Sequence, residues 1–177
     1  MTYKAVQVAH WIIGEATRQG LKITPMQLQK ILYYCQGWQL GMTGKPLFDD
    51  PVQAWQHGPV VHSVYDLYRR FGRYPIAPNT SEAPAEIAGL IRHCVKEKGS
   101  FSAYTLREMT HNETPYLSTP RNGEITQDVM KDFFEKTFYD VDEEDIYTPE
   151  YPTEDEAMKA TAEQFSEEEL DELISAL

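Results

Sequence analysis

The chain of 177 residues contains 41% hydrophobic and 12% aromatic residues, which suffices for one compact domain with a core and excludes global disorder. Its formal net charge of −12 argues against nucleic acid as the main partner, because phosphate backbones are bound by Lys and Arg. Residues 1–139 hold 15 basic and 13 acidic residues, whereas residues 140–177 hold 15 acidic residues and the single Lys159. We therefore divide the chain into a near-neutral helical domain over residues 1–139 and an acidic tail over residues 140–177.

The sequence shows neither a targeting segment nor a membrane span. The N-terminus lacks the succession of basic, apolar and small residues of a signal peptide. No apolar run reaches the roughly 20 residues that cross a bilayer. Cys35 and Cys94 lie in apolar helical patterns, so two buried reduced thiols are favoured, with a disulfide as the alternative. We expect a cytoplasmic protein without a membrane partner.

Apolar residues recur at helical spacing through most of the chain, which predicts a mainly α-helical fold. Thr24, followed by Pro25 and Gln27, has the pattern of a capping box that opens a helix. Ser102 and Thr126 have the chemistry of N-caps for two later helices. We expect a compact domain of about six helices, over approximately residues 6–19, 25–40, 60–71, 84–98, 103–110 and 126–138.

One stretch of the domain does not have the helical period. Residues 45–59 consist of two short apolar pieces on either side of a polar segment that contains Pro51. This pattern suits a small β-hairpin or an extended excursion and not a helix, and we expect a hairpin near residues 46–55. We expect Gly58-Pro59 to end the hairpin and the third helix to begin at Val60.

The acidic tail has two parts. Residues 140–155 contain two prolines among many acidic residues, which is typical of an extended linker. Ser166 and Glu169 then have the sequence pattern of a capping box, and four apolar residues follow at spacing i, i+3, i+4 and i+7. Such a short amphipathic helix is marginal alone in water and needs a surface to lie on. The alternative is a solvated charge run that only aids solubility. We favour a partner-binding element, with candidate residues Phe165, Leu170, Leu173, Ile174 and Leu177.

The segment over residues 54–61 is the most unusual in the domain. Trp55 and His57 place an aromatic face and a titratable group directly before a Gly-Pro pair, and both are candidate partner-binding residues. The simpler alternative, which spacing alone favours, is that Trp55 fills the core and His57 hydrogen-bonds a backbone carbonyl.

A second polar segment covers residues 110–116. Its Thr and Asn side chains suit the capping of two helix ends. A functional patch of His111, Glu113 and Tyr116 is the competing interpretation, and the pattern does not decide between the two. We carry these three residues as candidate partner-binding residues.

No residue pattern predicts a catalytic or metal centre. The five histidines form no HExxH motif, and the two cysteines show no paired-ligand spacing. Cys35 lies on an apolar helix face, where a thiol is inert. Neither GxGxxG nor GxxxxGK is present. We therefore expect no enzyme activity, no bound metal and no cofactor.

Taken in order, several segments resemble the signature of the Panacea domain family, also described as SocA-like or phage-associated proteins. They are residues 28–38 (LQKILYYCQGW), 46–49 (PLFD) and 54–61 (AWQHGPVV). Residues 106–116, which end in THNETPY, resemble the downstream motif of the family, in which Trp is commoner than the Tyr116 of this chain. The likeness spans about residues 5–138, and this ordered succession is far more specific than any single motif.

The resemblance implies an antitoxin that neutralises a toxin encoded beside it by direct protein–protein contact. The family's toxins are diverse, which implies a shared scaffold with variable partner recognition. Some SocA-like members are described as adaptors that deliver the toxin to the ClpXP protease, so an AAA+ protease is the alternative partner. The family is not known for a catalytic residue set, and its likeness does not extend to the acidic tail.

Three rival functions give different expectations. A proteolytic adaptor would lower the amount of toxin, whereas occlusion would leave an intact inactive complex. An enzyme would use His57 or His111 as a general base. A DNA-binding autorepressor would use the cluster of Arg69, Arg70 and Arg73, although arginines at a helix end are usually solvated there. We expect the antitoxin, and the sequence leaves a homo-oligomer open.

Overall fold

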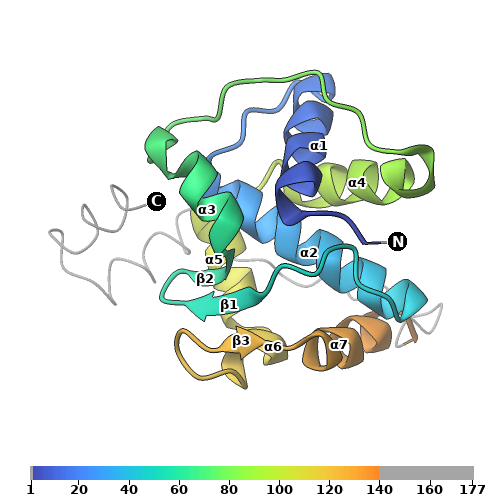
Figure 1. Cartoon of the computed structure of the whole chain (residues 1–177). Helices are drawn as coiled ribbons and strands as arrows, with labels where there is room; N and C mark the ends of the chain where they lie inside the picture. The colour runs from blue at the N-terminus through green and yellow to red at the C-terminus, as the bar shows by residue number, and fades with distance from the viewer. Residues whose placement is uncertain (1, 140–177) are drawn as a thin grey trace, which may run out of the picture.

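The structure is a computed structural model, and it describes residues 2–139. The predicted acidic linker, the C-terminal amphipathic helix and the candidates Phe165, Leu170, Leu173, Ile174 and Leu177 lie outside the described residues. The division of the chain after residue 139 therefore stays a prediction. The described part is mainly α-helical with a small antiparallel sheet, as the sequence predicts (Figure 1).

Helix α2 (Pro25–Thr43) forms the centre of the fold. The predicted capping box is present: the Gln27 amide nitrogen donates to Thr24 Oγ1 at 3.4 Å, and the Thr24 amide nitrogen donates to Gln27 Oε1 at 2.8 Å. Gly44, with a φ of 69°, ends the helix. Residues 25–37 are all buried, whichever way they point, so the first two thirds of α2 are covered on every side.

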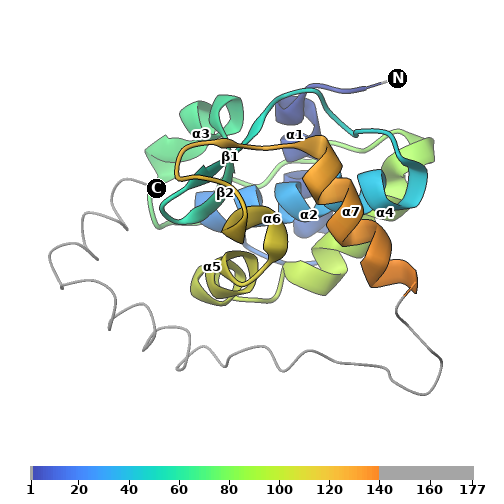
Figure 2. The same ribbon diagram turned by 90° about the horizontal axis from the view of Figure 1, so that it is seen from below.

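Four helices provide most of this cover. Helices α1 (Ala5–Arg18) and α4 (Ala85–Lys98) pack on α2 and on each other. Helix α7 (Gln127–Tyr139) lies along the opposite side of α2, and α5 (Ala103–His111) closes a further side (Figure 2). Apolar side chains from all of these helices therefore meet α2 in one core.

Cys35 on α2 and Cys94 on α4 are buried free thiols, which confirms the prediction from the sequence. Burial raises the pKa of the Cys94 thiol well above its ordinary value, and a hydrogen bond with Cys35 adds to the effect. Both thiols therefore belong to the packed interior between α2 and α4.

The small sheet has the order β2-β1-β3, and both pairings are antiparallel. Strands β1 (Val52–Trp55) and β2 (Gly58–Val61) pair from Val52 opposite Val61 to Trp55 opposite Gly58, which leaves a two-residue turn of Gln56 and His57. Strand β3 (Glu124–Ile125) pairs with the other edge of β1. The β1–β2 turn therefore projects at one end of the sheet.

The predicted position of the hairpin, near residues 46–55, is wrong. The hairpin covers residues 52–61, and Gly58-Pro59 begins its second strand instead of ending it. Pro59 is compatible with a strand here because β2 is an edge strand. Val60 and Val61 belong to β2, and α3 (His62–Tyr68) begins two residues later than predicted. A 3₁₀ turn, η1 (Arg69–Phe71), continues α3.

Residues 2–139 contain seven α-helices, against about six predicted. The additional helix is α6 (Thr114–Leu117), a single turn within the segment that follows α5. Pro115 lies in its first turn, where a missing N–H has no cost.

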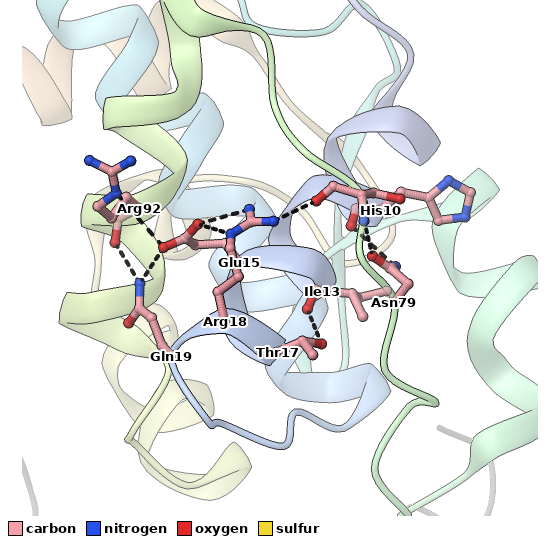
Figure 3. A network of polar contacts seen from close by, with 9 residues as sticks. His10, Ile13, Glu15, Thr17, Arg18, Gln19, Asn79 and Arg92 are labelled. Carbon is pink, nitrogen blue, oxygen red and sulfur yellow. Dashed lines mark hydrogen bonds and ion pairs between the residues drawn. The ribbon is translucent and has the colours of Figure 1, made fainter.

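The long segment between η1 and α4 is fastened to α1 by polar contacts (Figure 3). The Asn79 side chain donates to the His10 carbonyl at 3.2 Å, and Arg18 donates to the Ser81 carbonyl at 3.1 Å. Gly14 permits this approach, because a Cβ there would lie 2.1 Å from the Ser81 carbonyl oxygen. The loop therefore lies directly on the backbone of α1.

The same network joins α1 to α4 (Figure 3). Glu15 is buried, and its carboxylate accepts hydrogen bonds from Arg18 and Gln19, each at 2.9 Å. Arg92 on α4 lies 3.9 Å away. Burial opposes ionisation, but the bonds from Gln19 and Arg18 hold the pKa of Glu15 below its ordinary value. The buried carboxylate is thus charged and paired.

Two glycines of α2 allow α7 to approach closely. A Cβ at Gly37 would lie 2.1 Å from the Phe134 ring, and one at Gly41 would lie 2.8 Å from the Phe134 backbone. The Phe134 ring fills the resulting space and packs against Tyr33 with a centroid distance of 5.5 Å. The α2–α7 contact therefore depends on small residues at these two positions.

We predict that Gly37→Ala destabilises the domain by about 1–3 kcal/mol, because overpacking outweighs the gain in helix propensity. Gly89→Ala on α4 is the matched control, since nothing lies within 4 Å of a Cβ there. It should stabilise the domain by about 0.5–1 kcal/mol. Urea unfolding measures both changes, and equal stabilisation by the two variants would contradict the close α2–α7 contact.

Candidate functional site

The polar residues of α2 hold the segments that surround the hairpin. The Gln29 side chain donates to the Val61 carbonyl at 3.2 Å and accepts from the Val61 amide at 2.8 Å. Gln36 binds the segment before β1 in the same way: its side chain donates to the Phe48 carbonyl at 2.8 Å and accepts from the Leu47 amide at 2.8 Å. Each buried amide thus provides the donor and the acceptor that a neighbouring strand would provide.

Lys30 makes the third such contact from α2. Its side chain is 0% exposed, and Nζ donates to the Pro59 carbonyl at 3.1 Å. Burial, together with the charge of Arg107, lowers the pKa of Lys30 to about 7. The Pro59 carbonyl in β2 is therefore bound by a lysine amine that is partly neutral at pH 7.

Gly58 is required at the start of β2 for two reasons. Its φ of 102° lies in the region that favours glycine. A Cβ there would also lie 2.8 Å from Lys30 Cε and 2.9 Å from Thr110 Oγ1. The β1–β2 turn is therefore pressed against both α2 and α5.

His111, at the end of α5, lies between two backbone carbonyls. Nδ1 is 2.8 Å from the Arg107 carbonyl oxygen, and Nε2 is 3.0 Å from the Gln56 carbonyl oxygen. Burial and the charge of Arg107 lower the pKa of His111 to about 4, so the ring is neutral at pH 7 and donates to one of the two. The imidazole therefore acts as a spacer between α5 and the β1–β2 turn.

Tyr116 and Arg121 hold the same turn from α6 and the segment after it. The Tyr116 hydroxyl donates to the Trp55 carbonyl at 2.8 Å, and its ring packs on His111 with a centroid distance of 4.3 Å. Arg121 Nη2 donates to Gln56 Oε1 at 2.7 Å. Two further elements thus hold the turn, α6 through the backbone of Trp55 and the following segment through the side chain of Gln56.

Glu113, the third candidate of the 110–116 segment, points toward α2. Its carboxylate accepts from the Tyr33 hydroxyl at 2.8 Å and from the Tyr34 hydroxyl at 2.6 Å. Burial raises the pKa of Glu113, against the opposing effect of the two hydroxyl donors. Lys98, which lies 4.6 Å from the Tyr34 ring centroid, adds a positive charge nearby. Glu113 therefore joins α2 to the segment between α5 and α6.

Trp55 is turned outward, contrary to the expectation that it fills the core. It is half-buried and lies outside the core cluster. Its indole packs edge-on against Tyr65 and His62 of α3, with centroid distances of 5.0 Å and 5.7 Å. Its Nε1 donates to Gln53 Oε1 at 3.0 Å. We call Trp55, His62 and Tyr65 the Trp55 surface.

His57 occupies the β1–β2 turn and is half-buried. Burial, with the charges of Arg107 and Lys30, lowers the pKa of His57 to about 3, so its ring is neutral at pH 7. Arg107 itself is 1% exposed and contacts the Glu108 carboxylate. The surroundings of the turn are therefore rich in buried positive charge.

The described candidate residues all lie around the β1–β2 turn. Their side chains, however, face different parts of the molecule. His57, His111 and Tyr116 lie at the β1–β2 turn, Glu113 lies behind it against α2, and Trp55 contributes to the outer surface. Within residues 2–139, no group of three or more His, Cys, Asp or Glu side chains is placed to hold a metal ion. None of the helices in the described part has both the length and the apolarity of a bilayer span.

Comparison with known proteins gives a family for this arrangement. Residues 28–116, about half of the chain, match the family described as Antitoxin SocA-like, Panacea domain. The chain belongs to this family. A 65-residue segment is also 34% identical to the Antitoxin SocA of Caulobacter vibrioides (strain NA1000 / CB15N), over 37% of this chain and 35% of that protein. The match thus spans about a third of the relative's length. No solved structure matches the chain with significance.

The Panacea segment contains all the contacts that hold the hairpin from α2, α5 and α6. The Tyr116 hydroxyl, at a position where the family resemblance favours Trp, binds the Trp55 carbonyl. Position 116 therefore helps to fix the β1–β2 turn in this chain.

Several residues that hold the hairpin and its neighbouring segments were not among the candidates from the sequence. They are Gln29, Lys30, Gln36, Gln56, Arg107 and Arg121. The signal that could have found the first three is their place on a helix whose other faces are apolar, since polar residues in such a helix must bind something inside the domain.

We predict that Lys30 makes the domain more stable as the pH rises. Its pKa is about 7 in the folded state and has the ordinary value of 10.5 in the unfolded chain. Between these pH values the unfolded chain binds more protons, so the unfolding free energy increases with pH. Urea unfolding at pH 7 and pH 9 should show that wild type gains about 2–3 kcal/mol relative to Lys30→Met, because one pKa unit corresponds to 1.36 kcal/mol.

Lys22→Met is the control for this measurement, because Lys22 is exposed. It should keep the pH dependence of the wild type. If Lys30→Met keeps that pH dependence as well, Lys30 does not have the lowered pKa that its burial implies.

Proposed function

We propose that this chain is an antitoxin that neutralises a toxin encoded beside it by direct protein–protein contact in the cytoplasm. Membership of the Antitoxin SocA-like, Panacea domain family supports the antitoxin role. The observation that carries the binding mechanism is the Trp55 surface, a partly exposed aromatic cluster formed by the last residue of β1 and two rings of α3, beside the β1–β2 turn that α2, α5 and α6 hold in place.

The physical properties of the Trp55 surface suit an interface. Trp and Tyr are enriched among the few residues that dominate binding energy, because they bury a large area with little loss of side-chain freedom. The Tyr116 hydroxyl fixes the backbone of Trp55, so little further ordering is needed on binding. An interface of this kind gains affinity through preorganisation.

The candidate histidines support a binding role over catalysis. His57 and His111 have pKa values lowered to about 3 and about 4, far from the range of an efficient general base at neutral pH. Both ring nitrogens of His111 also contact backbone carbonyls of the domain. The proposal therefore includes no catalytic residue, metal or cofactor.

The acidic tail completes the proposal. Residues 140–177 carry a net charge of −14, which suits a toxin whose active site is basic because it binds nucleic acid or nucleotide phosphates. Electrostatic attraction would accelerate encounter, and the four apolar residues after Ser166 would prolong the complex. The alternative within the same family is delivery of the toxin to an AAA+ protease such as ClpXP.

We predict that Trp55→Ala weakens binding of the product of the adjacent reading frame by about 30-fold or more, the effect of losing a central aromatic contact. Calorimetric titration with the purified toxin measures the dissociation constant. The matched control is Met42→Ala, a large apolar residue that is 53% exposed in the last turn of α2.

Two further results would contradict the proposed binding site or the proposed mechanism. Unchanged affinity of Trp55→Ala would show that the toxin binds elsewhere. If toxin levels in cells fall with wild type and recover when the AAA+ protease is removed, delivery replaces occlusion as the mechanism.

We predict that neutralising the tail slows association with the toxin about tenfold at low salt and flattens its salt dependence. The changes are Glu167→Gln, Glu168→Gln, Glu169→Gln, Asp171→Asn and Glu172→Gln. Stopped-flow association at several salt concentrations provides the rates.

The matched control removes five acidic groups from exposed positions of the domain. It combines Glu82→Gln, Glu97→Gln, Glu124→Gln, Asp128→Asn and Asp132→Asn. The tail has no role in encounter if both sets of changes alter the rate equally.

A further inference from the structure

One exposed surface of the domain combines positive charge with apolar area. It lies at the end of α3, on η1 and on the turn that follows, at the far end of α3 from His62. We call it the arginine surface, and its members are Leu67, Arg69, Arg70, Arg73 and Tyr74. Leu67 is 40% exposed and Tyr74 is 65% exposed, so both present apolar area to the solvent beside the arginines.

Aromatic rings orient two of the three arginines. The Arg70 guanidinium lies 5.2 Å from the Phe71 ring centroid, and the Arg73 guanidinium lies 5.5 Å from the Tyr74 ring centroid. Stacking of this kind orders the planar group, whose N–H edge can bind a carboxylate with two parallel hydrogen bonds. The arginine surface is therefore prepared for carboxylates.

The arginine surface also concentrates the positive charge of the domain. Residues 1–139 carry a balance of only +2, and three of their basic groups lie within five consecutive positions here. The neighbouring acidic residue, Asp66, contacts His62 on the same helix, with 3.2 Å between its carboxylate and Nδ1. A solvated helix end would account for the arginines alone, but the exposed Leu67 and Tyr74 beside them indicate a docking surface.

We propose that residues 166–177 of the same chain dock on the arginine surface. The inference goes beyond the proposed function, because the docking needs no toxin.

The segment matches the surface in both charge and apolarity. It has acidic residues at five of its first seven positions, and its apolar stripe of Leu170, Leu173, Ile174 and Leu177 needs a surface to lie on. Leu67 and Tyr74 provide apolar contact, and the arginines provide partners for the acidic side chains. The complementary pattern favours this occupant over nucleic acid, which the segment's own charge of −5 would repel from the same site.

The chain is long enough for the contact. Residues 140–165 separate the end of α7 from the segment, and 26 residues span up to about 85 Å when fully extended. A domain of 139 residues is about 40 Å across. A connection of this length gives an effective concentration on the order of 1 mM, so an intrinsic dissociation constant in that range suffices.

The two ends of α3 then have different partners. The Trp55 surface includes His62 at the beginning of α3 and Tyr65 at its middle, and the arginine surface begins at Leu67 near its end. A docked segment would lie beside the Trp55 surface in the free protein. A basic partner would compete with the arginines for the same carboxylates, so the segment would exchange one basic surface for another when the partner binds.

The test uses the full chain with a nitroxide spin label at Ser175→Cys, since Cys35 and Cys94 are buried. Nuclear magnetic resonance reports the amide signals of residues 67–74 in the absence of a toxin. These signals should lose about half of their intensity or more, because an effective concentration near the dissociation constant keeps the segment docked half of the time. The loss should be smaller in 1 M salt, where the Debye length falls to about 3 Å.

The variant that tests the surface combines Arg69→Glu, Arg70→Glu and Arg73→Glu, which should abolish the broadening. The matched control combines Lys22→Glu, Lys45→Glu and Lys96→Glu at exposed positions, and it should keep the broadening. The dispersion of the remaining amide signals verifies that both variants fold.

Three outcomes would overturn the proposal. Broadening absent from residues 67–74 in the wild type means that the segment does not dock there. Broadening that appears only when isotope-labelled chains are mixed with spin-labelled ones assigns the surface to a second copy. Shifts of the same signals on addition of a short DNA duplex, without any broadening by the label, assign it to nucleic acid.

Discussion

The fold depends on helix α2, whose first two thirds are buried on every side and yet carry polar side chains. Leaving a buried donor or acceptor without a partner costs about 1–3 kcal/mol, so Gln29, Lys30 and Gln36 of α2 each need a hydrogen-bonding group inside the domain. They find it in the backbone of residues 47–48 and 59–61. The position of the β-hairpin follows from this requirement, because its second strand is bound to the central helix as to a neighbouring strand.

This division of roles gives the hairpin an inner and an outer side. The inner side is bound by α2, α5 and α6 through contacts that leave little room for change, as the missing space for a Cβ at Gly58 illustrates. The outer side carries Trp55, whose contacts with His62 and Tyr65 involve surface rings only. Substitution on the outer side can therefore change the exposed surface while the contacts that bind the hairpin to α2, α5 and α6 stay unchanged.

Local chemistry made the helices predictable, as the capping box at Thr24 and the N-cap at Ser102 show. The hairpin was misplaced because the glycine conformation at Gly58 and the edge position of Pro59 depend on Lys30 and Thr110, which are distant in sequence. The role of Glu113 was equally hidden, since its two tyrosine partners come from α2. Trp55 was expected in the core because spacing cannot tell which side of a short strand faces solvent.

Helices α1 and α7 lie outside the matched residues 28–116, although both cover faces of α2. The Phe134 ring on α7 fills the space that Gly37 leaves open. The stretch that the family match covers is therefore shorter than the unit that packs into one core. A fragment limited to residues 28–116 would leave the α1 and α7 faces of the central helix bare, so any transfer of a folding-competent module into another gene needs both flanking helices.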